Sequence, residues 1–466
     1  MKTSPLHAAA STALIILPGS ASLLFVREDT TLQYDFTNRA KRWTGNLVTQ
    51  ACEDKATPQD TQLTENSTCA SLVPLSRSLL KQSHQVILEY GKWCSQIYSV
   101  NGTARYAGTV ATAQDMLHYI QLSAKDQGKN PDDAKLWFYG ISYGTILGPT
   151  FASLYPEKVE RMILDGVLEL EDHYKGAWEK SLANSDEAAR FWFKRCFEAG
   201  PQICAFHQNA TSWEEIEQRY WSLFNDLKDN PIGLGDPISQ DVIDSAKEGT
   251  IFFSASYIIA PLFYSLLDKT LVELQTGNYS QLQFVAIAAT ISTFAPVYDD
   301  RMSRTLINCL DANGRSNYTE FGAYKDFVNS MASSSAYAGL KVATFSGPIC
   351  SQLNLFPPES QAFDGIPRVE GRKLPILFVS GIADPITPLP SAERMQTYFP
   401  SSGLLKWNNS GIWKHCAHFQ KSACVSQYEK QFMLHGTIPP ANTTCDIDQP
   451  NPFLIAVEQL ADDAQS

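Results

Sequence analysis

The sequence predicts an α/β protein with a mostly parallel central sheet and an inserted helical domain. Three short apolar segments that end at Gly or Asp have the length of buried strands. The first begins the stretch 135–147, and the other two occupy residues 161–167 and 374–380. Helical patterns separate these segments, which is typical of parallel strands. From about residue 170 to 340 the pattern is helical without a convincing strand, which indicates the insertion.

The inserted helices set the expected domain boundaries. They are rich in aromatic residues at helical spacing, which predicts packed cores, and they cover residues 188–198, 212–227 and 241–274. We therefore place a helical cap at 171–340, between core parts at 22–170 and 341–466. The uncharged stretch 251–267 has 17 residues and contains Pro261, which indicates a buried helix, so no membrane partner is expected.

The composition is that of a globular protein without a nucleic-acid partner. Of 466 residues, 44% are hydrophobic and 18% are charged, so the chain can form a sizeable core. The net charge of −12, from 37 basic and 49 acidic residues, comes without a basic stripe for a phosphate backbone.

The ten cysteines predict disulfides. They contain no CxxC pair and no histidine spacing typical of zinc, so neither a metal nor another cofactor is expected. Cys196 and Cys204 enclose residues 197–203, a loop short enough for a local bridge. The ten positions are 52, 69, 94, 196, 204, 309, 350, 416, 424 and 445.

Several features predict entry into the secretory pathway. Disulfides belong to oxidising compartments, and N-glycosylation sequons are more frequent than chance would give. The start has Lys2, an apolar run at 8–17 and small residues at 18–21, as in a signal peptide covering 1–21. Alternatively, residues 14–17 are an early strand of the sheet. The sequons begin at Asn66, Asn101, Asn209, Asn278, Asn317, Asn408 and Asn442.

A serine nucleophile is expected at Ser142. The sequence Gly140-Ile-Ser-Tyr-Gly144 follows an apolar strand and precedes a helix, which is the context of a nucleophile elbow in the α/β-hydrolase fold. The flanking glycines avoid collisions with the neighbouring strand and helix. The N–H of Tyr143 is then one oxyanion-hole donor.

In that fold an acid and a histidine follow the serine in chain order. Asp384 comes just after the strand at 374–380 and is the preferred acid, while Asp165 is the rival, with capping as its alternative role. His415 and His418 follow Asp384 at a distance that suits one helix and one strand, and position alone leaves them nearly equal.

These motifs resemble the secreted tripeptidyl aminopeptidase-like serine exopeptidases, which are relatives of the prolyl iminopeptidases, and especially their fungal members. The resemblance covers roughly residues 85–446. In the family the base precedes a cysteine, and a Ser-x-Cys ends nine residues further on; His415, Cys416 and 422–424 match, so the resemblance favours His415. The resemblance rests on the segments GISYGTILG (140–148), FASLYP (151–156), RMILDGV (161–167), DPITP (384–388), 416–424, and 436–440 with Cys445.

The sequence departs from the family at two places. Lys414 stands where the family usually has Gly before the base. The glycine-rich loop that supplies the second oxyanion donor is shortened to 14–22 (LIILPGSAS) or missing, depending on which interpretation of the N-terminus holds. Loss of one donor would cost about 10²- to 10³-fold in turnover.

The resemblance implies an exopeptidase that cleaves short peptides from free N-termini through an acyl-enzyme. Glu169, Glu171 and Asp172, at the start of the cap, are candidates for binding the α-ammonium group of the peptide. An esterase or lipase of the same fold is one alternative, because the triad does not separate esters from amides. An inactive secreted homologue is another, favoured by the altered glycine loop.

Overall fold

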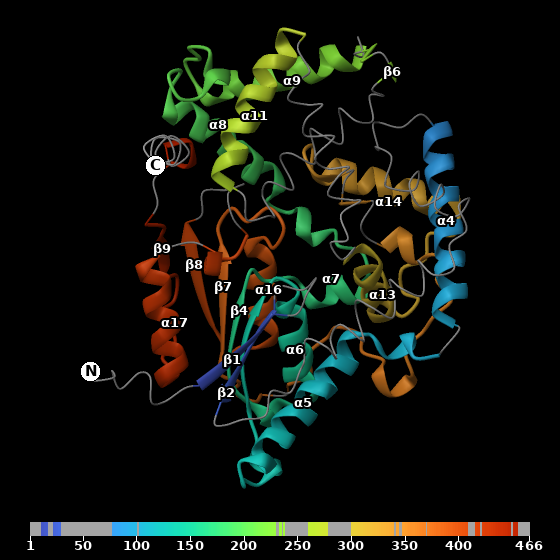
Figure 1. The fold of residues 1–466 in the computed structure, drawn as a ribbon, viewed down its shortest axis with the longest axis vertical. Helices are drawn as coiled ribbons and strands as arrows, with labels where there is room; N and C mark the ends of the chain where they lie inside the picture. Colours follow the sequence, from blue (N-terminus) through green and yellow to red (C-terminus); the bar gives the residue numbers. More distant parts are fainter. Residues whose placement is uncertain are drawn as a thin grey trace, which may run out of the picture.

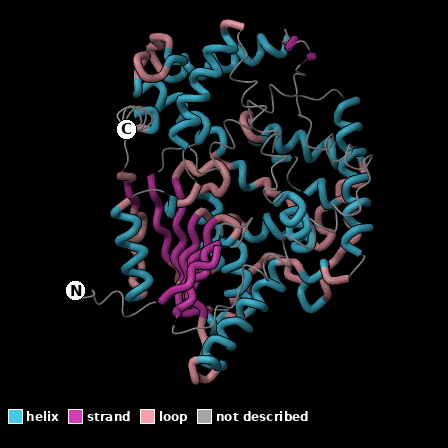
Figure 2. The backbone as a smooth tube through the Cα atoms, in the orientation of Figure 1, coloured by secondary structure: helices cyan, strands magenta, loops and turns pink. Residues whose placement is uncertain are grey.

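In the computed structural model the chain contains one large sheet and many helices (Figures 1 and 2). The structure describes residues 11–16, 22–28, 77–99, 102–229, 233–234, 236–237, 260–277, 300–339, 342–343, 347–369, 371–408, 415–419, 422–448 and 451–454. Every structural statement below concerns these residues.

The large sheet has seven strands in the order β1-β2-β3-β4-β7-β8-β9. All pairs from β3 to β9 are parallel, whereas β1 and β2 form an antiparallel pair and β2 runs antiparallel to β3. The predicted mostly parallel sheet is therefore present. The strands are β1 Ser11–Ile16, β2 Ser22–Glu28, β3 Leu136–Ile141, β4 Val159–Asp165, β7 Ile376–Gly381, β8 Gly403–Asn408 and β9 Thr444–Asp446.

The parallel strands are buried because helices cover both faces. Phe138, Leu164 and Phe378 point to the face covered by α5 Thr109–Asp126, α6 Gly144–Leu154 and α16 Leu389–Tyr398. Ile163 and Leu377 point to the other face, which α17 Ala423–His435 covers (Figure 1). Burial on both faces explains why these strands are continuous apolar runs in the sequence.

The predicted helical insertion is present as helices that lie partly above one end of the sheet and partly beside it (Figure 1). Its helices at 185–199, 213–229 and 260–275 share a core in which Trp192, Phe193 and Tyr220 are almost fully buried. The expectation that it lacks strands is wrong in one small respect, because β5 Gly233–Leu234 and β6 Asp236–Pro237 pair with each other. Its helices are α7 Leu170–Lys175, α8 Ser185–Ala199, α9 Trp213–Asp229, α11 Ala260–Gln275, α13 Asp300–Ala312 and α14 Phe321–Ser334.

A long helix that the sequence analysis did not identify, α4 Arg77–Ser99, packs beside this group. Leu80 of α4 is buried in the cluster that contains Met331 of α14. The predicted helix at 241–274 is described only from Ala260, where α11 begins. Within the described ranges, no helix has the length and apolarity needed to cross a membrane.

Three disulfides join described cysteines: Cys196–Cys204, as expected, Cys309–Cys350 and Cys424–Cys445. Cys94 and Cys416 are free and buried. Cys52 and Cys69 lie outside the described residues.

At the N-terminus the structure has the arrangement of an early strand. Residues 11–16, inside the segment expected as a signal peptide, form β1, and Ser22 at the start of β2 pairs with Gly140. The segment 17–21 between them lies outside the described residues. Cleavage near residue 22 stays a prediction.

Candidate active site

Ser142 lies in a sharp turn between β3 and α6. Its φ is 55°, a left-handed value that is uncommon for a residue with a side chain. The turn is held because the Ser142 N–H donates to the carbonyl of Asp165 at 3.0 Å, and the Thr145 N–H donates to the carbonyl of Ser142 at 2.8 Å. This conformation places a half-buried serine at the carboxyl edge of the parallel strands.

The glycines around Ser142 are required by close packing. A Cβ on Gly140 would lie 2.4 Å from Phe138 and 2.6 Å from the carbonyl oxygen of Gly144. A Cβ on Gly148 would lie 2.8 Å from both Leu164 and Phe138. The strand and helix can therefore approach closely only where these side chains are absent.

Asp384 and His415, which are 31 residues apart, meet in a buried pair. Asp384 follows β7 and is fully buried, and its Oδ2 lies 2.9 Å from Nδ1 of His415. Its Oδ1 accepts the N–H groups of Ile386 at 2.9 Å and Thr387 at 2.8 Å. Thr387 Oγ1 is also 2.9 Å from His415 Nδ1. The imidazole is thus fixed through Nδ1, which leaves Nε2 for proton transfer.

Each member of this pair favours the charged form of the other. Burial by itself raises the pKa of Asp384, but the charge of His415 and the hydrogen bonds to the carboxylate lower it overall. Burial by itself lowers the pKa of His415, but the charge and hydrogen bond of Asp384, and the charge of Asp165, raise it overall. The pair can therefore stabilise an imidazolium that forms during a reaction.

Gly166 brings the histidine loop next to the serine turn. Its φ is 71°, and a Cβ there would lie 2.9 Å from His415 Cε1 and 2.3 Å from Cys416 Sγ. The residue before it, Asp165, holds the N–H of Ser142. His415 Nε2 is buried and has no hydrogen-bond partner among the described residues, so it is not hydrogen-bonded to the Ser142 hydroxyl in this structure.

The two rival residues have other contacts. The Asp165 carboxylate accepts the backbone N–H groups of Ala417 and His418 at 2.9 and 2.8 Å. The His418 ring packs edge-on against Tyr139, and burial lowers its pKa. The geometry therefore joins Asp384 to His415 and gives Asp165 a role close to the capping alternative.

Tyr143 immediately precedes the first residue of α6, so its N–H has no acceptor within the helix. Its hydroxyl hydrogen-bonds with Thr109 Oγ1. Thr109 in turn donates its hydroxyl and its N–H to Asp311, the N–H at 2.9 Å, and His173 Nε2 lies 2.8 Å from the same carboxylate. This buried Asp311 network links the residue after the serine to α13 and α7 of the insertion.

The three predicted ammonium-binding carboxylates have different surroundings. Glu171 bonds to Lys175 at 2.7 Å and Tyr398 at 2.8 Å, and these hydrogen bonds lower its pKa to about 2. Asp172 accepts the Lys180 N–H at 3.0 Å, and burial raises its pKa to about 6. Glu169 is half-buried, its pKa is raised by burial, and no described residue hydrogen-bonds with its carboxylate. The charges of Lys180, Arg394 and Lys175 partly offset this effect of burial on the Glu169 pKa.

Other predicted sites have mixed outcomes. Four sequon asparagines, Asn209, Asn317, Asn408 and Asn442, are exposed, as glycosylation requires. Asn66, Asn101 and Asn278, together with Lys414 before the histidine, lie outside the described residues. Among the described side chains, no three His, Cys, Asp or Glu residues converge as metal ligands.

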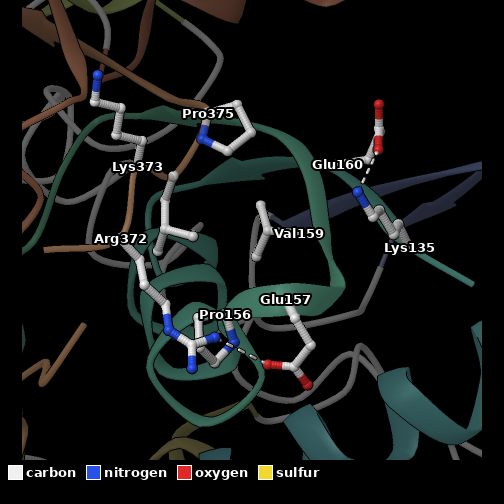
Figure 3. A pocket seen from close by; sticks show the side chains of 9 residues that line it. Lys135, Pro156, Glu157, Val159, Glu160, Arg372, Lys373 and Pro375 are labelled. Carbon is white, nitrogen blue, oxygen red and sulfur yellow. Dashed lines mark ion pairs between the residues drawn. The ribbon is translucent and has the colours of Figure 1, made fainter. Parts of the chain in front are cut away.

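A surface hollow lies at the opposite edge of the sheet (Figure 3). It is lined by Val159 at the start of β4 and by Pro375, which precedes β7. Its charged side chains pair across it, Lys135 with Glu160 at 3.4 Å and Arg372 with Glu157 at 3.5 Å. The hollow is therefore separate from Ser142, which lies at the carboxyl edge.

Comparisons with known proteins agree with this architecture. Residues 343–445 match the family described as TAP-like protein. Over 448 residues the chain is 22% identical to the tripeptidyl aminopeptidase of Streptomyces lividans, covering 92% of this chain and 75% of the relative. The corresponding protein of Streptomyces coelicolor is also 22% identical, with 92% and 74% covered. The serine protease Hip1 of Mycobacterium tuberculosis is 24% identical over 346 residues, 73% of this chain and 62% of the relative.

The sheet, its flanking helices and the family match define an α/β-hydrolase fold. Within that superfamily the chain is related to serine peptidases. These relatives are bacterial, so the predicted closeness to fungal members is not supported.

Proposed function

We propose that the protein is a serine exopeptidase with Ser142 as nucleophile, His415 as general base and Asp384 as the residue that orients the base. The observation that carries the proposal is the buried Asp384–His415 pair, whose loop packs on Gly166 beside the serine turn. His415 Nε2 has no partner among the described residues, while Nδ1 is held.

In the proposed reaction His415 Nε2 takes the proton of the Ser142 hydroxyl as Oγ bonds to the scissile carbonyl carbon. The carbonyl oxygen becomes an oxyanion, and the Tyr143 N–H donates a hydrogen bond to it. The C–N bond then breaks, and the leaving amine takes the proton from His415. Water attacks the resulting ester with the same base, which releases the acyl product and restores the serine.

The proposal includes release of short peptides from free N-termini. The names of the Streptomyces relatives support this substrate class. Glu169 supports it through its position: it is a half-buried carboxylate at the start of α7, four residues after the end of β4. A buried ammonium group needs such a counter-charge. We also propose that the protein is secreted and glycosylated, on the basis of its disulfides and the exposed sequons.

One sequence feature favours a second candidate, a catalytically impaired homologue. The family's glycine-rich loop is either shortened to residues 14–22 in this sequence or missing from it. An impaired homologue would keep the reactive serine but turn over slowly. An esterase would also label at the serine, and it would prefer ester substrates to peptides.

The proposal is tested by labelling with a fluorophosphonate probe. We expect the wild-type protein to label and Ser142→Ala to lose all labelling. Ser153→Ala, on the same helix α6, should label normally, because Ser153 donates to the carbonyl of Pro149 and is placed outside the site. Labelling of Ser142→Ala at the wild-type rate would refute the nucleophile.

Substrate class is tested with matched tripeptide substrates that have a free or an acetylated N-terminus. A requirement for the free amine should appear as at least a tenfold loss of kcat/KM on acetylation, which is about 1.4 kcal/mol of binding. Equal cleavage of the two substrates would contradict exopeptidase specificity, and cleavage of esters alone would favour the esterase.

A further inference from the structure

Asp165 contacts both of the loops that carry the proposed nucleophile and base. We propose that Asp165 is a positioning residue that fixes the separation between Ser142 and His415 and places a second carboxylate beside the base. This inference rests on the proposed function, since it assigns roles to the serine and the histidine.

Asp165 holds both loops from one position in the sheet. Asp165 is the last residue of β4, which lies between the serine strand β3 and the acid strand β7. Its main-chain oxygen accepts the Ser142 N–H at 3.0 Å. Its two carboxylate oxygens accept the N–H groups of Ala417 and His418, at 2.9 and 2.8 Å. One rigid residue thus holds the serine turn through its backbone and the histidine loop through its side chain.

The Asp165 carboxylate also affects the charge of the base. Asp165 is fully buried, and burial raises its pKa to about 6 although the two N–H donors lower it. No described Lys or Arg pairs with it. A buried carboxylate without a cation is costly unless its environment favours the ion. Its charge is one of the factors that raise the pKa of His415, so this carboxylate favours the protonated base.

The groups around Asp165 explain how the site keeps that charge near neutral pH. On β3, the Tyr139 hydroxyl lies 3.3 Å from the Asp165 carboxylate and 2.6 Å from Glu429 of α17. Burial, together with the charge of Asp165, raises the pKa of Glu429 to about 8, which favours the protonated form of this neighbour. The remaining titratable neighbours are His415, Cys416 and His418 of the histidine loop and Asp384 after β7.

A matched carboxylate exists in the insertion. Asp268 of α11 is equally hidden, at 2% exposure, and accepts the backbone N–H groups of Ala205 at 2.9 Å and Phe206 at 2.6 Å. Burial also raises its pKa. None of these contacts involves the serine or histidine loops, so Asp268→Asn controls for the loss of a buried carboxylate that holds a turn.

The Asp165→Asn variant separates positioning from simple structural support. Its amide keeps one acceptor but presents an NH₂ group to the second N–H donor, so the histidine loop must shift. A displacement near 1 Å at a reacting group can cost about 10²-fold in rate. Loss of the negative charge should also lower the pKa of His415. Because the neutral imidazole is the active form, the acid limb of the kcat/KM profile should move to lower pH.

The experiment measures kcat/KM against pH per active site, with sites counted by fluorophosphonate titration. Asp165→Asn should show about a 10²-fold lower kcat at similar KM and a shifted acid limb, whereas Asp268→Asn should keep the wild-type values for each folded molecule. If Asp165→Asn keeps the wild-type kcat and acid limb, the proposal is overturned.

Two additions keep the test decisive. If Asp165→Asn does not fold, Asp165→Glu replaces it, because this variant keeps the charge but lengthens the side chain. The acid limb of its kcat/KM profile should stay in place while its kcat falls. A wild-type kcat in Asp165→Glu would contradict the positioning role. The titration of His415 can also be followed by NMR in Asp165→Asn. An unchanged His415 pKa would refute the electrostatic role whether or not the protein turns over peptides. Absence of labelling in the wild type would instead refute the proposed function.

Discussion

A methyl group at Gly166 would press directly on the proposed base and on the cysteine that follows it. In Gly166→Ala the new carbon would lie 2.3 Å from Cys416 Sγ, 2.9 Å from His415 Cε1 and 3.2 Å from Thr387 Oγ1. The backbone there has φ 71°, which a side chain disfavours. The histidine loop must therefore move away from β4, and His415 moves with it.

The size of the effect follows from these distances. A left-handed residue with a Cβ costs about 1–2 kcal/mol, and overpacking adds about 1–3 kcal/mol. The sulfur must retreat by about 1 Å to reach an ordinary contact near 3.4 Å. A shift of that size in the base predicts about a 10²-fold loss of kcat/KM.

Urea unfolding and kcat/KM per titrated active site are the two measurements. Gly128→Ala is the matched control, since Gly128 has φ 69° and a Cβ there meets nothing within 4 Å. The control should lose only the strain energy and keep its turnover. Adding Cys416→Ala to Gly166→Ala should recover stability but not full turnover, because the contact with His415 remains. If Gly166→Ala matched Gly128→Ala in both measurements, the packing of the base on Gly166 would be disproved.

Two further predictions concern the acid and the disulfides. Asp384→Asn should lower kcat by about 10⁴-fold and, because Asp384 raises the pKa of His415, should move the acid limb to lower pH. The stability that Asp384 contributes is present above its unfolded pKa and lost as pH falls through its lowered folded pKa, so the wild-type protein should lose this contribution on acidification and the variant should not. Replacing both cysteines of Cys309–Cys350, separated by 41 residues, should cost more free energy of unfolding than replacing Cys196–Cys204, separated by 8. The loop-entropy estimates are about 4 and about 2.5 kcal/mol, and equal losses in urea would contradict that account.

The site residues differ in how far local sequence could identify them. Ser142 is predictable because the strand, the glycines and the following helix are contiguous, and each is required by short-range packing. Asp384 meets His415 because β7 and β8 are parallel neighbours and each residue follows one of these strands. The sequence indicates this pairing only through the position of the two residues after successive strands. Asp165 is the least predictable of these residues, because the two backbone N–H groups that its carboxylate accepts lie more than 250 residues away.

Ambiguity in the remaining elements also has physical causes. An apolar run at 8–17 suits both a signal peptide and a strand, and the structure pairs residues 11–16 with β2. The position of Glu171 in the sequence suits a ligand for an ammonium group. Its carboxylate already accepts hydrogen bonds from Tyr398 and Arg394, which lie more than 220 residues away in the sequence. The helix α4 has no strand or motif beside it to mark its role, and it packs on helices that come far later in the chain.

The Asp311 network has a consequence for how freely part of the insertion can move. Asp311 belongs to the inserted helix α13 but accepts the N–H of Thr109 at the start of the core helix α5. To swing outward, α13 would have to break the bonds of a buried carboxylate, each worth about 1.5–3 kcal/mol. This carboxylate therefore anchors α13, and α7 through His173, to the sheet domain. The Tyr143 hydroxyl, one residue after Ser142, is therefore tied through Thr109 to a carboxylate that belongs to the insertion.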